Sequence, residues 1–253
     1  MIALLTDFGL TDHYVAVMKG SMLSVNPNAV IIDICHAIKP QAIREGAFIL
    51  KEAYSSFPKG TIFVAVVDPG VGSNRRALCI QTSRGYLIGP DNGVLALALE
   101  SETDYVIREI QNDQYFRKPV SATFHGRDIF GPTAAWLTKE NIFTKMGPVL
   151  QNIQKLPMTK AHLEADSIVG EIIYVDHFGN ALTNIPRKMV KTGKKQVRVR
   201  SVQLKKICGF FSEGEAGKLM AVWNSSEVLE LAVPNGSAAV KFGLKTGDKV
   251  RVS

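Results

Sequence analysis

The 253-residue chain has little cysteine and no long apolar run. Its three cysteines, Cys35, Cys79 and Cys208, include no C-x-x-C pair, which argues against a disulfide or zinc framework and for a reducing cytoplasm. The longest strand-like apolar run, Ile62–Val67, is about a third of the length of a membrane span. The first residues lack the basic region of a signal peptide. We therefore expect a cytoplasmic protein with no membrane partner. The five histidines have no metal-ligand spacing, so we also expect no metal.

The net charge of +7 is confined to the C-terminal part of the chain. Residues 1–167 carry as many acidic as basic side chains, so the whole excess lies in residues 168–253. Within that part, Arg187–Lys206 holds nine basic residues and no acidic one. Such a run fits either a nucleic-acid surface or the solvated side of ordinary strands. We expect an outer strand-and-loop surface here and no nucleic-acid partner.

Short β-rich runs alternate with helix-like stretches in the first part of the chain. The predicted buried strands are Ile2–Leu5, Val30–Ile34 and Ile62–Val67, and the predicted helices are Asp12–Val25, Gln41–Ser55 and Phe130–Thr138. Alternating β and α elements are typical of a layered domain in which helices cover a sheet. We therefore expect an α/β domain over residues 1–160, with a mostly parallel sheet flanked by helices.

The pattern changes after a polar stretch at 154–167, which we expect to be a linker. Few helix signals follow it, and Gly and Asn separate short β-rich runs. The predicted strands are Ile168–Val175, Gln196–Leu204, Lys218–Trp223, Leu229–Val233 and Val250–Val252. Residues 168–253 therefore predict a small all-β, barrel-like domain.

Three polar clusters lie where an open α/β sheet places its ligand sites, near the carboxyl ends of strands or the start of a helix. Asp7 and Asp12 follow the first strand and could hold a sugar diol or an amine, or one of them could only cap a helix. Asp68 follows the third strand, and Arg75 lies across a Gly-rich turn from it. The two side chains could form a structural ion pair or a site that orders a water. His125 precedes a helix and could transfer a proton or be structural. Residue types alone leave these alternatives open.

Polar groups also end the strands of the β domain. Asp176–Asn180, Asn224–Glu227 and Asn235–Ala239 are the segments concerned. Asn side chains and backbone groups can read the edge of an adenine, and Phe178 can stack on a flat ring. The same residue types dominate turns for backbone reasons, so both interpretations remain open.

The motifs taken together resemble the family of S-adenosylmethionine (SAM) hydroxide adenosyltransferases, the adenosine-forming SAM hydrolases related to fluorinase and chlorinase. They cover nearly the whole chain in order. They are T-D-F-G-x-x-D-x-Y-V (Thr6–Val15), D-I-x-H-x-I-x-P (Asp33–Pro40), V-D-P-G-V-G (Val67–Gly72), G-P-D-N-G (Gly89–Gly93), F-H-G-R-D-I-F (Phe124–Phe130), D-x-F-G-N-x-x-T-N (Asp176–Asn184), N-S-S (Asn224–Ser226) and L-E-L-A-V-x-N-G-S-A-A (Leu229–Ala239).

The resemblance implies a homotrimer in which SAM binds between the N-terminal domain of one subunit and the C-terminal domain of its neighbour. It implies a catalytic trio of Asp68, Arg75 and His125. In the N-terminal domain, the implied substrate contacts are Asp7 with the ribose hydroxyls and Asp12 nearby. In the C-terminal domain, Asp176 would contact the methionine amine and Asn180 the adenine, with Phe178 packing close. The strand that would supply the carboxylate and adenine contacts carries Ser225, Ser226, Glu230, Val233 and Asn235. Halogenating relatives carry a Tyr at the Asp68 position and an Arg where this sequence has Ser226.

The expected activity is hydrolysis of SAM to adenosine and L-methionine by water attacking C5′. SAM is then the substrate, and no cofactor is expected. Two alternatives remain: a halogenase that forms 5′-halo-adenosine, and a non-catalytic binder of adenosine or nucleic acid, which the basic run motivates.

Overall fold

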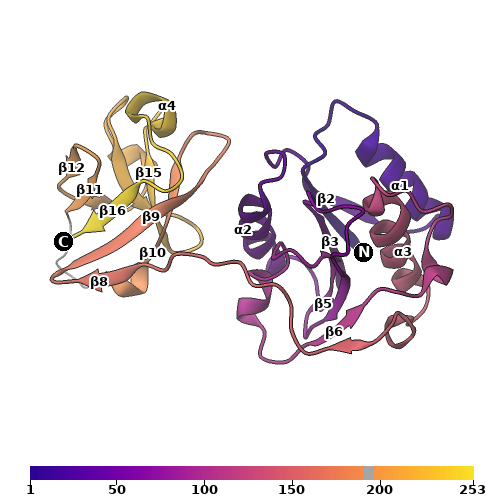
Figure 1. Cartoon of the computed structure of the whole chain (residues 1–253). Coiled ribbons are helices and arrows are strands. Elements are labelled where there is room, and N and C mark those ends of the chain that lie inside the picture. Colours follow the sequence, from indigo (N-terminus) through magenta and orange to yellow (C-terminus); the bar gives the residue numbers. More distant parts are fainter. Residues whose placement is uncertain (191–195) are drawn as a thin grey trace. The chain divides into compact units, whose positions relative to one another are not determined.

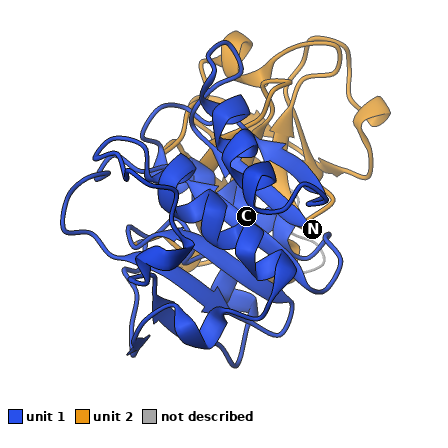
Figure 2. Ribbon diagram, turned by 90° about the vertical axis from the view of Figure 1, so that its right-hand side faces the viewer, with its two compact units in different colours: residues 1–156 blue, residues 157–253 orange. Residues whose placement is uncertain are grey.

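The computed structural model describes residues 1–190 and 196–253, which divide into two compact units (Figures 1 and 2). Unit 1 is Met1–Leu156 and unit 2 is Pro157–Ser253. The division lies inside the stretch 154–167, where we expected a linker. Each unit has its own sheet and its own buried core. Among these described residues, no helix is long and apolar enough to cross a membrane.

Unit 1 is a mixed α/β unit built on a seven-stranded sheet in the order β2-β1-β3-β5-β4-β6-β7. The strands are β1 Ile2–Thr6, β2 Ile31–Cys35, β3 Thr61–Val66, β4 Ala77–Gln81, β5 Gly85–Pro90, β6 Val106–Glu109 and β7 Val149–Leu150, and the helices are α1 Tyr14–Val25, α2 Ile43–Tyr54 and α3 Gly131–Lys139. The β2-β1-β3-β5 half is parallel, whereas β4, β6 and β7 add antiparallel pairs. The expected mostly parallel sheet is thus parallel in one half only. The reason is the short connection between β4 and β5, which permits a hairpin and is too short for a parallel crossover.

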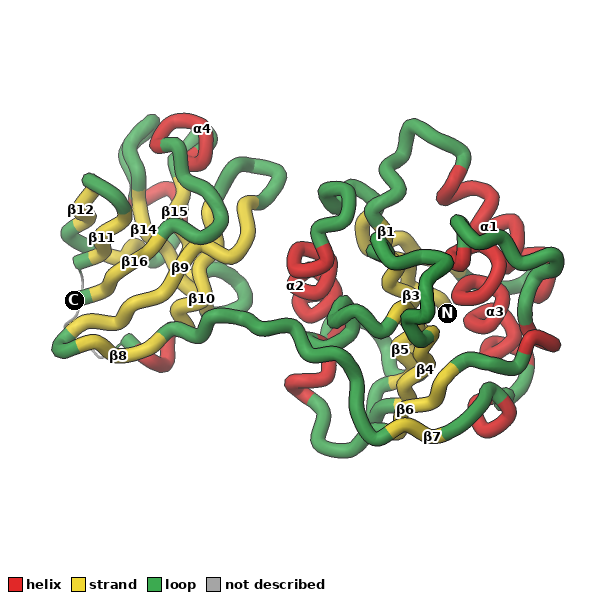
Figure 3. The backbone as a smooth tube through the Cα atoms, viewed as in Figure 1, coloured by secondary structure: helices red, strands yellow, loops and turns green. Residues whose placement is uncertain are grey.

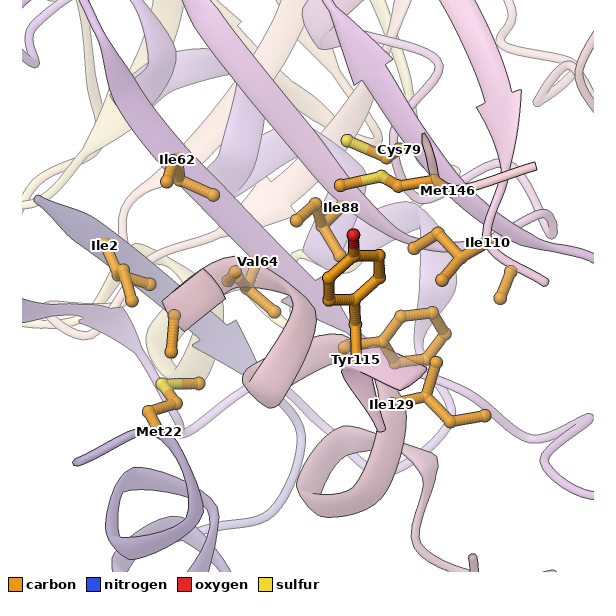
Figure 4. Packing of buried hydrophobic residues seen from close by; sticks show 14 of the residues in the cluster. Ile2, Met22, Ile62, Val64, Cys79, Ile88, Ile110, Tyr115, Ile129 and Met146 are labelled. Carbon is orange, nitrogen blue, oxygen red and sulfur yellow. The ribbon is translucent and has the colours of Figure 1, made fainter. Parts of the chain in front are cut away.

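Buried cores lie on both faces of this sheet because side chains alternate along each strand. Ile2 and Leu4 of β1 belong to a core with residues of α1 and α3, part of which Figure 4 shows. Ala3 and Leu5 belong to a second core with residues of α2, which covers the opposite face (Figure 1). Strand β2 lies at the edge of the sheet, and its Ile32 is exposed, so the prediction of a buried strand there is wrong.

Unit 2 is a nine-stranded, barrel-like sheet that is nearly closed (Figure 3). Its elements are β8 His162–Glu164, β9 Ser167–Val175, β10 Ala181–Pro186, β11 Val197–Val199, β12 Val202–Leu204, β13 Ile207–Cys208, β14 Met220–Trp223, β15 Val228–Ala232, α4 Ala238–Phe242 and β16 Lys249–Val252. The order is β12-β11-β16-β9-β10-β15-β14-β13, and β8 pairs with β9. Several details depart from the expectation. The short helix α4 interrupts an otherwise β-rich unit, and β8 forms within the stretch expected to be a linker. The predicted strand Gln196–Leu204 is two antiparallel strands, β11 and β12, because the chain turns at Arg200, whose φ is +49°. Strand β10 was not predicted.

The basic run Arg187–Lys206 lies on the surface of unit 2 wherever it is described. Its residues 191–195 lie outside the described residues. Strand β11 alternates, so Val197 and Val199 are buried while Arg198 between them is exposed. Two of the arginines are paired: Arg187 with Glu227 at 3.2 Å and Arg200 with Asp248 at 2.9 Å. The described part is therefore an outer surface, as expected, with carboxylates beside part of its charge.

Candidate functional site

The smaller of two candidate pockets lies in unit 1, where strands β1, β2 and β3 end. Asp7 directly follows β1, Gln41 comes after β2, and Asp68 comes two residues after β3. Because these strands are parallel, their carboxyl ends bring the three residues to one edge of the sheet. The pocket has a volume of about 290 Å³, and His125 and the ring of Phe124 also line it.

Asp68, Arg75 and His125 form a continuous hydrogen-bonded chain beside this pocket. Arg75 Nε lies 3.0 Å from each carboxylate oxygen of Asp68, and Arg75 Nη2 donates to Oδ2 at 2.5 Å. The same Nη2 donates to His125 Nδ1 at 2.6 Å. The side chains of Arg75 and Asp68 are only 10% and 5% exposed. Three residues from separate motifs therefore meet, and the Asp68–Arg75 contact is a nearly buried ion pair.

The contact with Arg75 fixes the tautomer of His125. A guanidinium has donors only, so Nδ1 accepts and the proton of the neutral ring is on Nε2. Burial lowers the pKa of His125, and the positive charge of Arg75 lowers it further, against smaller opposing effects of Asp68 and Asp128. His125 is therefore a neutral imidazole at pH 7 with one N–H to donate.

Gly72 allows the turn between Asp68 and Arg75 to pack closely. Its φ is +79°, a conformation that residues with a Cβ rarely adopt. A Cβ at this position would lie 2.3 Å from the carbonyl oxygen of Ala122. Gly72 therefore lets the turn pack against the segment that leads to His125. The Gly-rich turn noted in the sequence serves this packing.

The two N-terminal aspartates have different surroundings. Asp7 lines the pocket, and its Oδ2 accepts from the backbone N–H of Gln41 at 2.7 Å. Gln41 has a φ of +66°, which is uncommon for a residue other than glycine. Asp12 is exposed on the turn before α1 and lines neither this pocket nor the pocket of unit 2. The structure thus brings Asp7, and not Asp12, to the site.

His36 supports the loop that carries Asp7, a role that the sequence did not suggest. His36 is 4% exposed, and its Nδ1 lies 2.8 Å from Thr6 Oγ1. Its backbone carbonyl accepts from Gly9 N at 2.8 Å, and its Nε2 lies 3.0 Å from Asp33 Oδ1. Contacts on both sides of Asp7 therefore tie the loop to His36, which explains why the motif Asp33–Pro40 accompanies the motif around Asp7.

Asp128 anchors the segment that carries His125. It is fully buried and accepts from Arg127 at 2.7 and 2.8 Å, from Ser121 N at 2.9 Å and from Arg117 at 3.3 Å. Burial raises the pKa of Asp128, but these hydrogen bonds, with that of Arg127 foremost, lower it more, and the net pKa is below its ordinary value. Asp128 is therefore an ionised, fully bonded anchor at neutral pH.

The larger pocket, with a volume of about 1050 Å³, lies in unit 2. Asp176 follows β9, and its carboxylate accepts from Asn180 N at 2.8 Å and Asn180 Nδ2 at 3.2 Å, which closes the loop between β9 and β10. Gly179 in this loop has a φ of +81°, and a Cβ there would lie 1.9 Å from Ser237 Oγ. The ring of Phe178 lines the pocket and is 73% exposed. The loop therefore presents a carboxylate, an amide and an uncovered aromatic ring to one pocket.

Every residue predicted for the site in unit 2 lines this pocket except Ser226. Those that do are Asp176, Phe178, Asn180, Ser225, Glu230, Val233 and Asn235. Ser226 is exposed on the turn between β14 and β15, where its backbone N–H donates to Asn224 Oδ1 at 3.0 Å. The pocket is also lined by Phe211 and Trp223, which the sequence analysis missed. The sequence offered one signal for Phe211: two adjacent aromatic residues, Phe210 and Phe211, precede a polar stretch. In the structure both are exposed.

Family models match both units. The model of the SAM hydroxide adenosyltransferase N-terminal domain matches residues 2–147, and that of the C-terminal domain matches residues 170–251. The chain belongs to the SAM hydroxide adenosyltransferase family. The resemblance drawn from the motifs is confirmed.

The relatives of this SAM hydroxide adenosyltransferase family member cover its full length. It is 36% identical to a Salinispora tropica protein named (R)-S-adenosyl-L-methionine hydrolase, over 100% of this chain and 97% of that protein. It is 30% identical to a fluorinase of Nocardia brasiliensis, over 100% of this chain and 96% of that protein. A crystal structure of an uncharacterized conserved protein from Thermotoga maritima matches with a TM-score of 0.93 at 38% identity, over 100% of this chain and 99% of that one. The named hydrolase is thus more similar than the fluorinase.

Proposed function

We propose that this protein is a SAM hydrolase that forms adenosine and L-methionine. The observation that carries the proposal is the Asp68–Arg75–His125 chain, because it puts a carboxylate acceptor and a neutral N–H donor beside one pocket. Relatives named SAM hydrolase, 33–36% identical over nearly their full length, support the same reaction. SAM is the substrate of this reaction, and the proposal includes no cofactor and no metal.

Hydrolysis of SAM requires a positioned water and needs no acid to protonate the leaving group. The sulfonium of SAM is already a good leaving group, so the barrier lies in placing the nucleophile in line with C5′ and removing its solvent. As the C5′–O bond forms, the C5′–S bond breaks and its electron pair goes to the sulfur of methionine. The proton that the water loses goes to Asp68.

The hydrogen bonds of the trio fit these roles. A carboxylate has about four acceptor positions, so Asp68 can accept from a water in addition to Arg75. His125 donates from Nε2 to the water oxygen and holds it in place, and Arg75 keeps the other two side chains in fixed relation. Asp68 is the proton acceptor, and Arg75 and His125 are its positioning partners.

The remaining site residues of the two pockets bind different parts of the substrate. In the proposed arrangement, Asp7 binds the ribose hydroxyls, with Asp12 on the same loop outside the pocket lining. In unit 2, Asp176 binds the methionine amine, Asn180 binds adenine and Phe178 packs against the ligand. Ser225, Val233 and Asn235 supply the contacts to the methionine carboxylate and to adenine, whereas Ser226 lies outside the pocket lining.

We propose that the protein is a homotrimer in which each site combines unit 1 of one subunit with unit 2 of its neighbour. Each pocket described above is lined by residues of a single unit. The pocket in unit 1 holds the catalytic trio, and the pocket in unit 2 holds the groups for the amino acid and the base. Sedimentation analysis tests the trimer: a monomer that retains full activity would refute the shared site.

Halide transfer, as in the fluorinase relatives, is the less favoured reaction. A carboxylate in a poorly solvated pocket repels a halide ion through its negative charge. Asp68, whose side chain is 5% exposed, is such a group. The structure therefore favours water over chloride or fluoride as the nucleophile.

Product analysis with and without halide tests the proposal. The protein is incubated with SAM alone and with chloride or fluoride, and the products are separated by chromatography. We expect adenosine and methionine in every incubation. A 5′-halo-adenosine as the main product would support the halogenase instead. Absence of any product, together with salt-dependent RNA binding, would support the non-catalytic binder.

A further inference from the structure

Glu230 is the second carboxyl group of the pocket in unit 2, next to Asp176. It lies on β15, where Leu229 and Leu231 on either side of it are fully buried in the core of unit 2. Because side chains alternate along a strand, Glu230 is turned to the opposite face, where it lines the pocket. Its 5% exposure makes it a nearly buried carboxyl group aimed into a space for a ligand.

The surroundings of Glu230 favour its neutral form while the pocket is empty. Burial raises its pKa above the ordinary glutamate value, and the negative charge of Asp176 raises it further. A hydrogen bond with the Asn224 side chain acts in the opposite direction and is the smaller effect. Among the described residues, no cation is paired with Glu230 to offset this cost. Ionisation of this second carboxyl group is thus unfavourable in the empty pocket, and a bound cation would offset that cost.

We infer that Glu230, together with Asp176, binds the positively charged amino group of the methionine part of the substrate. An ammonium group has three donors and can serve two carboxylates at once. Its charge favours the ionised form of Glu230, so at any pH where Glu230 is protonated, binding of the cation is coupled to release of that proton. The inference rests on the proposed function, and it makes Glu230 a specificity-determining residue for a ligand with a charged amine.

The proton release predicts a definite pH dependence. Below the raised pKa of Glu230, binding the cation must also remove a proton, which weakens binding. Above that pKa, Glu230 is already ionised and binding is strongest. The affinity for L-methionine should therefore fall as the pH falls through the raised pKa of Glu230. The affinity for adenosine, which carries no amine charge, should not follow this trend.

Calorimetric titration of the full-length protein with L-methionine and with adenosine, from about pH 4, near the ordinary glutamate pKa, to about pH 8, tests the inference. For Glu230→Gln we expect roughly tenfold weaker methionine binding at the upper end of this pH range. We expect little change in adenosine binding and loss of the pH dependence of methionine binding. The matched control is Glu164→Gln, which removes an exposed carboxylate paired with Arg251 on β16 and should behave as wild type.

The outcomes separate this inference from the proposed function. Unchanged methionine affinity in Glu230→Gln, or an equal loss for adenosine, would overturn the role given to Glu230. If this variant does not fold, wild-type methionine affinity that is constant with pH overturns the inference in the same way. Wild-type protein that binds methionine with the expected pH dependence but does not cleave SAM would contradict the proposed function and leave the inference standing.

Discussion

Replacing Asp68 with asparagine removes one negative charge from the centre of the trio while keeping the shape of the side chain. Arg75 then loses the carboxylate that accepts from its Nε and Nη2. The amide oxygen of asparagine can still accept one of these hydrogen bonds. The charge of Arg75 has no such replacement, and its side chain is only 10% exposed. The substitution should therefore affect both stability and activity, for different reasons.

The expected loss of stability follows from burial. Removing one partner of a buried ion pair costs about 3–5 kcal/mol, and the remaining hydrogen bond places Asp68→Asn near the lower limit, about 3 kcal/mol. For a unit the size of unit 1, such a loss corresponds to a decrease in Tm of about 6–12 °C. Differential scanning calorimetry measures this decrease. Glu227→Gln, which alters the exposed pair with Arg187, should change the Tm little.

The expected loss of activity follows from proton transfer. Without a carboxylate to accept the proton of the attacking water, kcat for SAM hydrolysis should fall by about 10²–10⁴. Chromatographic detection of adenosine and methionine measures it below the melting transition of the variant. Turnover by Asp68→Asn within about threefold of wild type would refute the assignment of Asp68 as proton acceptor.

The double variant Asp68→Asn/Arg75→Gln separates the two effects. Removing both charges leaves no uncompensated guanidinium, so the double variant should be more stable than Asp68→Asn alone. Its activity should stay low, because the proton acceptor is still absent. Recovery of activity together with stability would mean that Asp68 acts only by holding the fold.

Three further substitutions or conditions test the site of unit 1. Because its pKa is lowered, His125 should stay neutral below the ordinary histidine value of 6.5. At saturating SAM, kcat of the wild type should then persist below pH 6.5 and fall when His125 Nδ1 takes a proton and can no longer accept from Arg75. A loss of kcat centred at 6.5 would contradict this. His36→Ala should raise KM for SAM more than it lowers kcat, since it loosens the loop that carries Asp7 and touches no reacting atom. An unchanged KM would show that His36 does not support this loop. Gly72→Ala should destabilise the protein by about 1–3 kcal/mol in urea unfolding, because its Cβ would meet Ala122, whereas Gly9→Ala, also at positive φ but with open space, should cost less.

Local sequence patterns predicted the buried central strands of unit 1. Strands β1 and β3 have uninterrupted apolar runs because both of their faces are buried, and these runs are visible in the sequence. The hairpin of β4 and β5 was missed because neither segment has a clear period and Gly85–Pro90 contains Gly and Pro, which interrupt its apolar run. The edge position of β2 was also missed, since an apolar run does not reveal which neighbours a strand has.

The candidate site shows the same division. Asp68, Arg75 and His125 could be assigned because each lies in a motif whose context matched the family. The geometry that joins them depends on the turn at Gly72 and on the buried anchor Asp128, which are long-range packing features. No local pattern distinguishes Asp7, which lines a pocket, from a nearby carboxylate that does not.

The confinement of each pocket to a single unit has a genetic consequence. In the proposed trimer, a defect at Asp68 and a defect at Asp176 damage different halves of a site, so the two halves can be supplied by different chains. When equal amounts of the two inactive variants are unfolded and refolded together, about a quarter of the sites should combine two intact halves. Two inactive alleles of this gene should therefore complement each other when they fall in different units, and fail to do so when both fall in one.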